Sequence, residues 1–276
     1  MSTLYVVGTP IGNLEDITLR ALRLLREVGL IDAEDTRHTR HLLSHFEITT
    51  PLTSYHEHNK DKKLWVLLEA LREKDVALVS DAGMPGISDP GYELVRAARE
   101  AGHAVRAVPG PSAVTTALSV SGLPADQFVY VGFLPRKKRE RAALLSELAR
   151  ETRTIVAFET PHRLLAALED IEQHLGERPL AVVREQTKVH EEVVRGTAQE
   201  ILAHFSAVPI KGEFTLVIGA GQVEKKSEQG RVRESLAELR RDGLSARDAV
   251  ARVSAETGES RRSVYQTLLE METPGR

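Results

Sequence analysis

The stretch SDAGMPGISDPG, residues 80–91, is the part of the chain best suited to hold a ligand. It follows an apolar run typical of a buried strand and contains three glycines and two prolines. Glycines let backbone amides approach a ligand closely, and loops at the carboxyl ends of parallel strands are where α/β proteins bind ligands. Asp81 would accept hydrogen bonds from a ligand amine or hydroxyl. The alternative is a long tight turn in which Asp89 caps the next helix.

Two other turns bear on the ligand class. The loop at 80–91 lacks the Gly-x-x-x-x-Gly-Lys-Ser/Thr pattern of a P-loop. The first strand is followed by GTPIGN, residues 8–13, which has too few correctly spaced glycines for a dinucleotide fingerprint. Nicotinamide chemistry is therefore disfavoured. The turn PGPSA, residues 109–113, feeds a helix. Ser112 is either the N-cap of that helix or part of a helix N-terminus whose amides receive a carboxylate.

A polar segment, EDTRHTRH at residues 34–41, follows a short predicted strand at residues 30–33. Asp35 or Thr36 is expected to cap a helix there. That helix would expose Arg37, His38 and His41. Two histidines three residues apart share a helix face, but no third ligand accompanies them, so we expect no metal site.

Charged residues also follow two later strands. The run RKKRER, residues 136–141, carries five positive charges in six residues, and anionic phosphate is a credible partner for it. Cations near a helix N-terminus oppose its dipole, so helix stability does not explain the run. Phe133 nearby would either stack on a base or belong to the core. The segment REQTK, residues 184–188, offers an acid, a base and a hydroxyl at a strand end, or else only a surface ion pair.

The elements that must position these residues alternate along the chain. Apolar, β-branched runs predict strands at residues 4–8, 30–33, 76–80, 105–108, 128–133, 154–158, 180–183 and 214–218. Amphipathic stretches between most of them predict helices. Strands that alternate with helices indicate an α/β fold with mostly parallel sheets. We expect an N-terminal α/β domain at 1–111, a second α/β domain at 112–222, and a linker with a helical module at 223–276.

The last segment carries helical patterns only. Ser245 and Asp248 form a Ser-x-x-acid helix start, Gly258 makes a turn, and Ser260 begins the last helix. Helix, glycine-containing turn and helix is the helix-turn-helix pattern, in which Arg261 and Arg262 would contact nucleic acid. The alternative is a plain three-helix bundle. Its apolar residues would then pack onto the catalytic body; these are Val250, Val253, Val264, Leu268 and Leu269.

Composition excludes several classes of protein. Hydrophobic residues make up 41% of the 276, which excludes a disordered or collagen-like chain. No apolar run is long enough to span a membrane, and the N-terminus lacks the pattern of a signal peptide. Cysteine is absent, so disulfides, thiolate zinc sites and cysteine nucleophiles are excluded together. A soluble intracellular protein is the simplest interpretation. The net charge of −3 argues against coating nucleic acid through bulk charge.

Taken in order, seven blocks of this sequence closely resemble one family, the ribosomal RNA small subunit methyltransferases I of the tetrapyrrole methylase superfamily. The blocks are LYVVGTPIGNLEDIT, AEDTRHTRHLL, SDAGMPGISDPGYELVR, PGPSAVTTALSVSGLP, GFLPRK, REQTK and KGEFTLVI. They cover residues 4–218, and the helical tail fits the family's C-terminal extension. The chain departs from the family at Met84 and Gly86, where the usual loop is SDAGTPLISDPG, and at Gln186, where Leu is more common.

The resemblance implies a fold and an activity. It implies two α/β domains with the cofactor cleft between them, and S-adenosylmethionine as the methyl donor to the ribose 2′-hydroxyl of a cytidine in 16S rRNA. A cytoplasmic homodimer that acts on the small ribosomal subunit is expected. The alternatives are methylation of a tetrapyrrole or another small molecule on the same fold, and a non-catalytic RNA-binding protein.

The resemblance also implies site residues. The cofactor positions carried over block by block are Pro10, Asp81, Gly83, Met84, Pro85, Ser112, Ala113 and Phe214. Candidates for assisting loss of the hydroxyl proton are Glu159, Glu185 and Lys188. Candidates for contacting RNA are Arg37, His38, Arg136, Lys137, Lys138, Arg139, Arg261 and Arg262.

Overall fold

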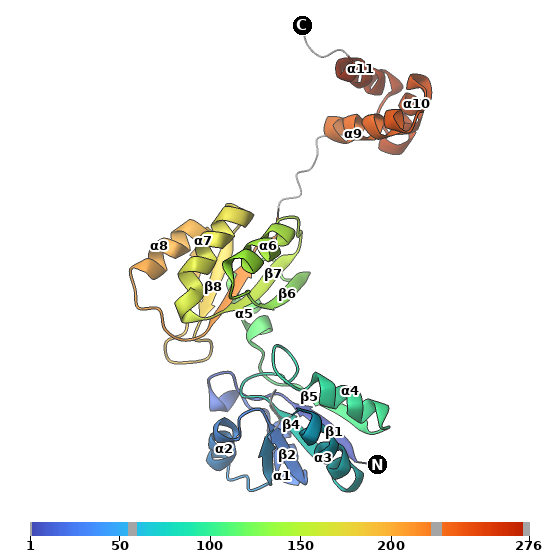
Figure 1. Cartoon of the computed structure of the whole chain (residues 1–276). Helices are drawn as coiled ribbons and strands as arrows, with labels where there is room; N and C mark the ends of the chain where they lie inside the picture. Colours follow the sequence, from blue (N-terminus) through green and yellow to red (C-terminus); the bar gives the residue numbers. More distant parts are fainter. Residues whose placement is uncertain (1, 55–59, 222–227, 273–276) are drawn as a thin grey trace. The chain divides into compact units, whose positions relative to one another are not determined.

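The computed structural model describes residues 2–54, 60–221 and 228–272 (Figure 1). The chain divides into two compact units, Met1–Gly221 and Gln222–Arg276. The first unit holds two β-sheets, and the described part of the second, residues 228–272, forms helices and the turns between them. No helix in the described ranges has both the length and the apolar character needed to cross a membrane.

The first sheet is parallel throughout, as the alternating pattern predicts. Its strands are β1 (Thr3–Val7), β2 (Leu30–Ala33), β3 (Leu52–Ser54), β4 (Val76–Val79) and β5 (Ala104–Val108), in the order β3-β2-β4-β1-β5. The helices between them are α1 (Leu19–Glu27), α2 (Thr36–His45), α3 (Lys60–Glu73) and α4 (Tyr92–Glu100). Helices α1 and α2 cover one face, and α3 and α4 cover the other.

Strand β4 shows why both faces are covered. Successive side chains of a strand point to opposite faces, and all four residues of β4 are buried. Ala77 and Val79 pack with α1 and α2, whereas Val76 and Leu78 pack with α3 and α4. A continuous apolar run is therefore required in the centre of this sheet.

The second sheet differs from the prediction of mostly parallel strands. Its strands are β6 (Phe128–Phe133), β7 (Thr154–Glu159), β8 (Leu180–Arg184), β9 (Glu192–Gly196) and β10 (Phe214–Ile218), in the order β6-β7-β10-β8-β9. In this described sheet only β6 and β7 pair in parallel, because β10 lies antiparallel between β7 and β8, and β9 is antiparallel to β8. A continuous apolar run signals two buried faces and carries no information about strand direction.

Helices also cover both faces of the second sheet. Helix α5 (Ala113–Ser121) packs on one face. The other face carries α6 (Lys138–Leu148), α7 (Leu164–Leu175) and α8 (Ala198–Ser206). Two short 3₁₀ turns, Leu14–Asp16 and Pro161–Arg163, precede α1 and α7. The domain boundaries at 111 and 222 remain predictions.

All eight predicted strands are present, with bounds that shift by one residue at most. The prediction missed β3 and β9. Strand β3 has only three residues, and β9 carries charged residues at both Glu192 and Arg195, so neither has the pattern of a buried strand.

The second unit contains α9 (Glu228–Arg241), α10 (Ala246–Thr257) and α11 (Arg261–Glu272). The Ser245 hydroxyl accepts a hydrogen bond from the Asp248 amide, and the Ser260 hydroxyl accepts one from the Ser263 amide, so both serines cap helices as predicted. Most of the apolar residues singled out in the tail form a core within this unit, namely Val250, Val253, Val264 and Leu268. Leu269 is 41% exposed. The predicted linker at 222–227 lies outside the described residues.

Candidate active site

A cavity of about 470 Å³ opens where the strand ends of the first unit meet. The loop after β4, the start of α5 and the ends of β6, β7 and β8 all contribute to its wall. Because β10 is antiparallel, its first residue Phe214 pairs with Glu159 and Arg184 at the ends of β7 and β8. The start of β10 therefore joins the same wall. Ligand pockets usually measure about 300–1,000 Å³, so this cavity has the volume of a small-molecule site.

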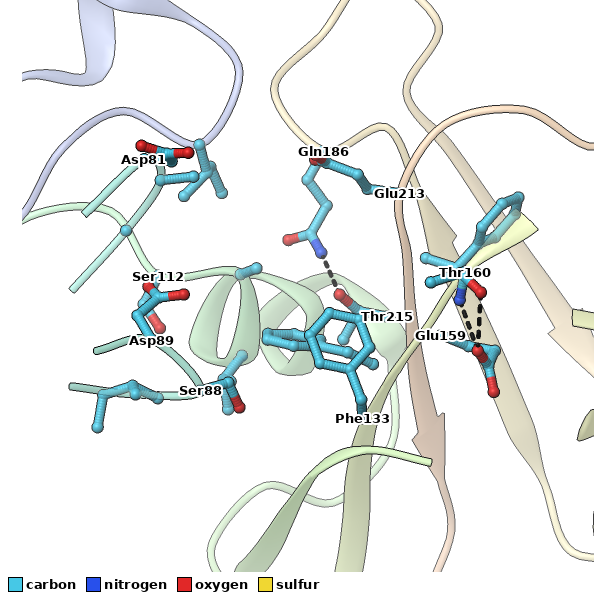
Figure 2. Close-up of a pocket in the computed structure, with 18 of the residues that line it drawn as sticks. Asp81, Ser88, Asp89, Ser112, Phe133, Glu159, Thr160, Gln186, Glu213 and Thr215 are labelled. Atoms are coloured by element: carbon cyan, nitrogen blue, oxygen red, sulfur yellow. Dashed lines mark hydrogen bonds between the residues drawn. The ribbon is translucent and has the colours of Figure 1, made fainter. Parts of the chain in front are cut away.

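One wall of the cavity is acidic. Glu34, Asp81 and Asp89 all line it, and Figure 2 shows Asp81 and Asp89 on the same side. Burial raises the pKa of Asp89 to about 6, and the Asp81 charge adds to the rise, while a hydrogen bond from Ser80 opposes it. Burial also raises the pKa of Glu34, with further contributions from Asp89 and Asp81. A wall of partly desolvated carboxylates favours a positively charged ligand group.

Close backbone packing holds the acidic loop in place. Thr9 and Gly83 exchange two backbone hydrogen bonds of 2.9 and 3.1 Å, which tie the loop after β1 to the loop after β4. Gly83 has φ of +78°, a conformation that favours glycine. The Asp81 carboxylate accepts a hydrogen bond of 3.1 Å from the Asp35 amide, so it also fixes the start of α2. The loop therefore presents Asp81 in a defined position.

Asp89 and Ser112, which the sequence offers as helix caps, make no capping hydrogen bonds. Asp89 does not cap α4, because that helix begins after Gly91 and its cap position makes no side-chain hydrogen bond. Ser112 sits at the N-cap position of α5, but its side chain does not cap the helix either. Both side chains instead line the cavity (Figure 2).

The opposite wall is partly aromatic and carries neutral polar groups. Two carboxylates on it, Glu159 and Glu213, are paired with Arg163 and Lys188. Gln186 donates a hydrogen bond of 2.8 Å from Nε2 to Thr215 Oγ1. Phe133 and Phe158 line the same cavity, with ring centroids 5.4 Å apart in an edge-to-face contact. Phe133 is 52% exposed, so it is a wall residue and not a core residue. Neutral polar groups beside aromatic faces suit a flat heteroaromatic ligand.

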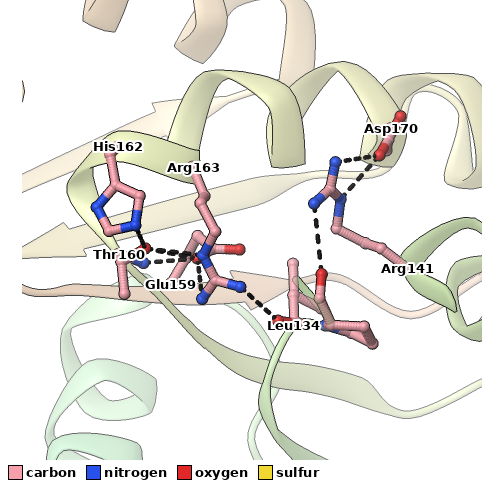
Figure 3. A network of polar contacts seen from close by, with 8 residues as sticks. Leu134, Arg141, Glu159, Thr160, His162, Arg163 and Asp170 are labelled. Carbon is pink, nitrogen blue, oxygen red and sulfur yellow. Dashed lines mark hydrogen bonds and ion pairs between the residues drawn. The ribbon is translucent and has the colours of Figure 1, made fainter. Parts of the chain in front are cut away.

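Glu159, the first of the three candidate catalytic residues, belongs to a network of hydrogen bonds and ion pairs (Figure 3). Its Oε1 atom lies 2.7 Å from Arg163 Nη2 and accepts a hydrogen bond of 2.6 Å from the Thr160 amide. Arg163 in turn donates to the Leu134 carbonyl at 3.1 Å. The Glu159 side chain is fully buried. These contacts hold Oε1 in place, whereas the buried Oε2 atom has no partner among the described residues.

Glu185 and Lys188 form an ion pair of 2.9 Å, and Lys188 also lies 3.1 Å from Glu213. Partial burial by itself would lower the pKa of Lys188, but hydrogen bonds to Glu185 and Glu213 outweigh it and raise that pKa. Burial likewise would raise the pKa of Glu185, but the hydrogen bond from Lys188 outweighs it and lowers that pKa. Lys188 is therefore a fixed cation near neutral pH.

A second cavity of about 320 Å³ adjoins the first. The two share Ile11, Asp81, Ala82 and Glu213 in their walls. The second cavity is lined in addition by Pro10, His38, His41 and Lys188. Gly12 lies so close to the loop at 186–188 that a Cβ atom there would come within 2.9 Å of the Gln186 carbonyl oxygen. Glycine at this position allows the two sheets' loops to meet around both cavities.

The structure gathers most of the predicted cofactor positions. Six of the eight line the first cavity, namely Asp81, Gly83, Met84, Ser112, Ala113 and Phe214. Pro10 lines the second cavity, and Pro85 is buried and lines neither. Among the catalytic candidates, Glu159 lines the first cavity and Lys188 the second, while Glu185 contacts Lys188.

The basic run is exposed at the start of α6, except for one member. Arg136, Lys137, Lys138 and Arg139 are all exposed. Arg141 is instead 4% exposed and lies 2.6 Å from Asp170, and it also donates to the Pro135 carbonyl (Figure 3). Arg141 is therefore an anchor that holds the segment before α6, and four cations remain on the surface.

The remaining RNA candidates lie on two helices. Asp35 caps α2 and pairs with Arg37 at 2.7 Å, as one of the sequence alternatives predicts. Arg37 and His38 are exposed. Among the described residues no group of three metal-ligating side chains includes His38 and His41. Arg261 and Arg262 are exposed at the start of α11, in the second unit.

Sequence reasoning missed several lining residues, chiefly Glu34, Asp89, Phe158, Gln186 and Thr215. Four of them follow or end a predicted strand, and that place was a usable signal, whereas Thr215 lies near the start of one. Gln186 and Thr215 are 8% and 3% exposed, so neither has the exposed polar character by which site residues are usually sought.

Comparisons with known proteins agree with this architecture. Residues 3–202 match the family described as Tetrapyrrole (Corrin/Porphyrin) Methylases, and residues 227–272 match the RsmI C-terminal HTH domain. A uroporphyrin-III-C-methyltransferase from Thermus thermophilus superposes with a TM-score of 0.57 at 25% identity, over 79% of this chain and 94% of its own. A cobalt precorrin-4 methyltransferase shares the fold, with a TM-score of 0.61 at 20% identity over 79% and 94%. The family match, which covers more than half of the chain, places this protein in the tetrapyrrole methylase family.

Relatives with higher sequence identity indicate to which branch of the tetrapyrrole methylase family this chain belongs. A Synechocystis protein named ribosomal RNA small subunit methyltransferase I is 50% identical over 100% of both chains. Proteins of the same name from Bacillus subtilis and Escherichia coli O157:H7 are 41% and 44% identical, over 96% and 98% of this chain and 93% and 95% of theirs. This chain belongs to the ribosomal RNA small subunit methyltransferase I family.

The cofactor of this methyltransferase is S-adenosylmethionine. The residues of the first cavity fit it on three counts. The acidic wall suits the positive charges of the sulfonium and the amino group. The amides at the start of α5 suit a carboxylate. The wall with Gln186 and the two phenylalanines has a buried acceptor, Gln186 Oε1, with no partner among the described residues, and it suits a heteroaromatic base.

Proposed function

We propose that this protein transfers a methyl group from S-adenosylmethionine to the ribose 2′-hydroxyl of a cytidine in the 16S rRNA of the small ribosomal subunit. The observation that carries the proposal is the 50% identity, over the whole of both chains, with a relative named for methylation of small-subunit rRNA. The hydroxyl and the nucleotide follow from the block resemblance.

S-adenosylmethionine supplies a methyl group that is already activated on sulfur. The first cavity would hold it, with Asp81 and Asp89 facing its cationic part and with Ser112 and Ala113 at its carboxylate. The protein then has to bring the hydroxyl into line with the methyl group and the sulfur, and alignment of this kind is a large part of catalysis by proximity.

The second cavity would receive the target ribose. It adjoins the first through Ile11 and Asp81, so a hydroxyl placed there would lie beside the cofactor. Lys188 lines it as a fixed cation, held by Glu185 and Glu213. A fixed cation stabilises the negative charge that develops on the hydroxyl oxygen as its proton passes to water and the methyl group moves from sulfur to that oxygen.

The three catalytic candidates therefore receive different proposed roles. Lys188 would act on the hydroxyl directly. Glu185 would position Lys188, since its Oε1 atom accepts from Lys188 and from the Glu213 amide. Glu159 would keep the wall at the end of β7 in place through its ion pair with Arg163.

Contacts to RNA would come from three exposed basic groups. Arg37 and His38 lie on α2, beside the second cavity that His38 lines. The four cations at 136–139 follow Phe133, which lines the first cavity. Arg261 and Arg262 would extend the contact from the second unit, whose family model is described as a helix-turn-helix domain. We further propose that the protein is a homodimer and acts in the cytoplasm.

Transfer of tritiated methyl from S-adenosylmethionine tests the proposal. We expect label in 16S rRNA when small subunits that lack this methylation are the acceptor, and digestion should return it as 2′-O-methylcytidine. Label in another nucleoside, or at a base atom, would contradict the proposal.

Uroporphyrinogen III should be tested in parallel, since a Thermus thermophilus structure of this fold is named for methylation of uroporphyrin-III. That structure covers only 79% of this chain, whereas the relative named for rRNA covers all of it. We therefore expect no transfer to the tetrapyrrole.

A further inference from the structure

Gln186 presents a buried hydrogen-bond acceptor to the first cavity. The residue follows β8, is 8% exposed and lines the cavity. Its Nε2 atom donates to Thr215 Oγ1, and its Oε1 atom has no partner among the described residues (Figure 2). A buried polar atom that stays unpaired costs free energy, because it has lost its hydrogen bonds to water. A donor on a bound ligand would remove that cost.

The surroundings hold the amide in this position. Thr215 is 3% exposed in the middle of the second sheet, so its hydroxyl is a fixed partner. The residues on either side of Gln186, Glu185 and Thr187, have φ of +51° and +64°, a conformation that non-glycine residues adopt only when the surroundings require it. The Glu185 side chain is tied to Lys188 and to the Glu213 amide. The amide is therefore presented to the cavity before any ligand arrives.

The side chains around Gln186 indicate which class of hydrogen-bond donor would bind there. A cationic donor is better placed on the acidic wall, at Asp81 or Asp89, than beside a neutral amide. Gln186 shares its wall with Phe133, Phe158 and the Thr215 hydroxyl. The carboxylates on this side, Glu159 and Glu213, already pair with cations of the protein, Arg163 and Lys188. A neutral N–H donor carried on a flat ring satisfies both the acceptor and the aromatic faces. The exocyclic amino group of a nucleobase has this chemistry.

We propose that Gln186 Oε1 accepts a hydrogen bond from the exocyclic amino group of the cofactor's adenine, which makes Gln186 a specificity-determining residue. The inference rests on the assignment of the first cavity to the cofactor under the proposed function. The cytosine of the target nucleotide carries the same kind of amino group, so the test separates the two sources.

The test compares two ligands by calorimetric titration of the full-length protein. S-adenosylhomocysteine carries the amino group, and S-inosylhomocysteine has a carbonyl oxygen in its place. Facing Gln186 Oε1, that carbonyl would leave two acceptors unpaired, so we expect the wild type to prefer the adenosyl ligand by roughly a hundredfold. Gln186→Met keeps the length of the side chain and removes both polar atoms. It should bind S-adenosylhomocysteine about tenfold more weakly and show little preference.

Two further variants test whether the effect of Gln186→Met on ligand preference is purely structural. Thr215→Val keeps the shape of Thr215 but frees the Gln186 amide, and we expect a partial loss of the preference. Gln173→Met replaces an exposed glutamine on α7 and should behave as the wild type. Circular dichroism would establish that all variants are folded.

The remaining outcomes overturn the inference. An unchanged preference in folded Gln186→Met, or a wild-type preference for the inosyl ligand, would overturn it alone. Failure of the wild type to bind either ligand would overturn the cofactor assignment as well. If Gln186→Met keeps its ligand preference but methylates uridine in place of the target cytidine, the amide acts on the substrate base, and the adenine assignment is wrong.

Discussion

Asp89 and Asp81 lie in one loop, but their carboxylates have different surroundings. Asp89 is partly buried, and its pKa is raised to about 6 mainly by desolvation. Asp81 accepts a hydrogen bond from the Asp35 amide, which satisfies one of its oxygens. The two carboxylates would therefore interact differently with the cationic part of a ligand, and each supports a separate prediction.

Replacing Asp81 should weaken S-adenosylmethionine binding without unfolding the protein. Removing a hydrogen bond to a charged group costs about 1.5–3 kcal/mol, so we expect Asp81→Ala to bind roughly 10- to 100-fold more weakly in calorimetric titration. Asp81→Asn is the matched variant, because it keeps an acceptor for the Asp35 amide and removes only the charge. Wild-type affinity in both variants would contradict the assignment of Asp81 to the cofactor.

Cofactor affinity should also depend on pH through Asp89. A cationic ligand binds the ionised carboxylate, and Asp89 ionises as the pH rises through about 6. We therefore expect affinity to increase between pH 5 and pH 7 and then to level off. Titrations in buffers of different ionisation enthalpy should show proton release on binding near pH 6. Asp89→Asn should remove this dependence, and a variant that retains it would assign the titration to another group.

The raised pKa of Asp89 also affects the stability of the folded protein. The folded state of Asp89 holds its proton more tightly than the unfolded chain, whose pKa is near 3.8. The folded state therefore binds more protons between about pH 4 and 6, and stability from this group falls as the pH rises through that window. A ligand cation that pairs with Asp89 would offset the loss.

At the scale of elements, two arginines hold the segment between β6 and α6. Arg163 donates to the Leu134 carbonyl and Arg141 to the Pro135 carbonyl. Arg141 is itself fixed by its buried ion pair with Asp170. These contacts place Phe133 at the cavity and leave the four cations at 136–139 exposed.

Replacing these four cations should affect RNA binding and leave cofactor binding unchanged. With Arg136, Lys137, Lys138 and Arg139 changed to Ala, the affinity for small subunits should fall. The dependence of log affinity on log salt concentration should also flatten, by roughly 0.7–0.9 for each phosphate that the variant no longer neutralises. Filter binding across a salt series measures this slope.

The control for that experiment is a pair of exposed arginines that lie outside the basic run. Arg72 pairs with Glu69 and Arg96 with Glu100. Changing both to Ala should leave the slope as it is. An unchanged slope in the fourfold variant too would mean that the run is only a solvated helix start.

At the scale of the whole molecule, each of the two units has a core of its own. The cavities belong entirely to Met1–Gly221. The second unit buries Leu236, Val253, Val264 and Leu268 among its three helices.

A protein that ends at Gly221 should therefore fold and bind S-adenosylmethionine with wild-type affinity. It should lose activity on small subunits if Arg261, Arg262 and α11 contact RNA. Gel filtration, calorimetry and methyl transfer measure these three properties. Full activity of the soluble truncated protein would contradict an RNA contact by the second unit, and an insoluble one would mean that the first unit depends on the second for burial.

The local sequence determined the elements and the places where polar residues end strands. Apolar runs located eight strands, and Ser245, Ser260 and Asp35 were recognisable as helix caps, because these signals depend on neighbours a few residues away. The seven blocks of sequence that resemble one family indicated that family and, with it, the cofactor. What each strand-end residue contacts was not determined at this level.

The tertiary structure alone decided those contacts. Antiparallel β10 inserts between β7 and β8, and only this order sets Thr215 beside Gln186, 29 residues away. Glu159 is fully buried because its strand, β7, lies inside the second sheet between β6 and β10. Asp89 acquired its raised pKa from burial beside Asp81. Desolvation and hydrogen-bond pairing arise from packing between distant segments, and no short pattern in the sequence encodes that packing.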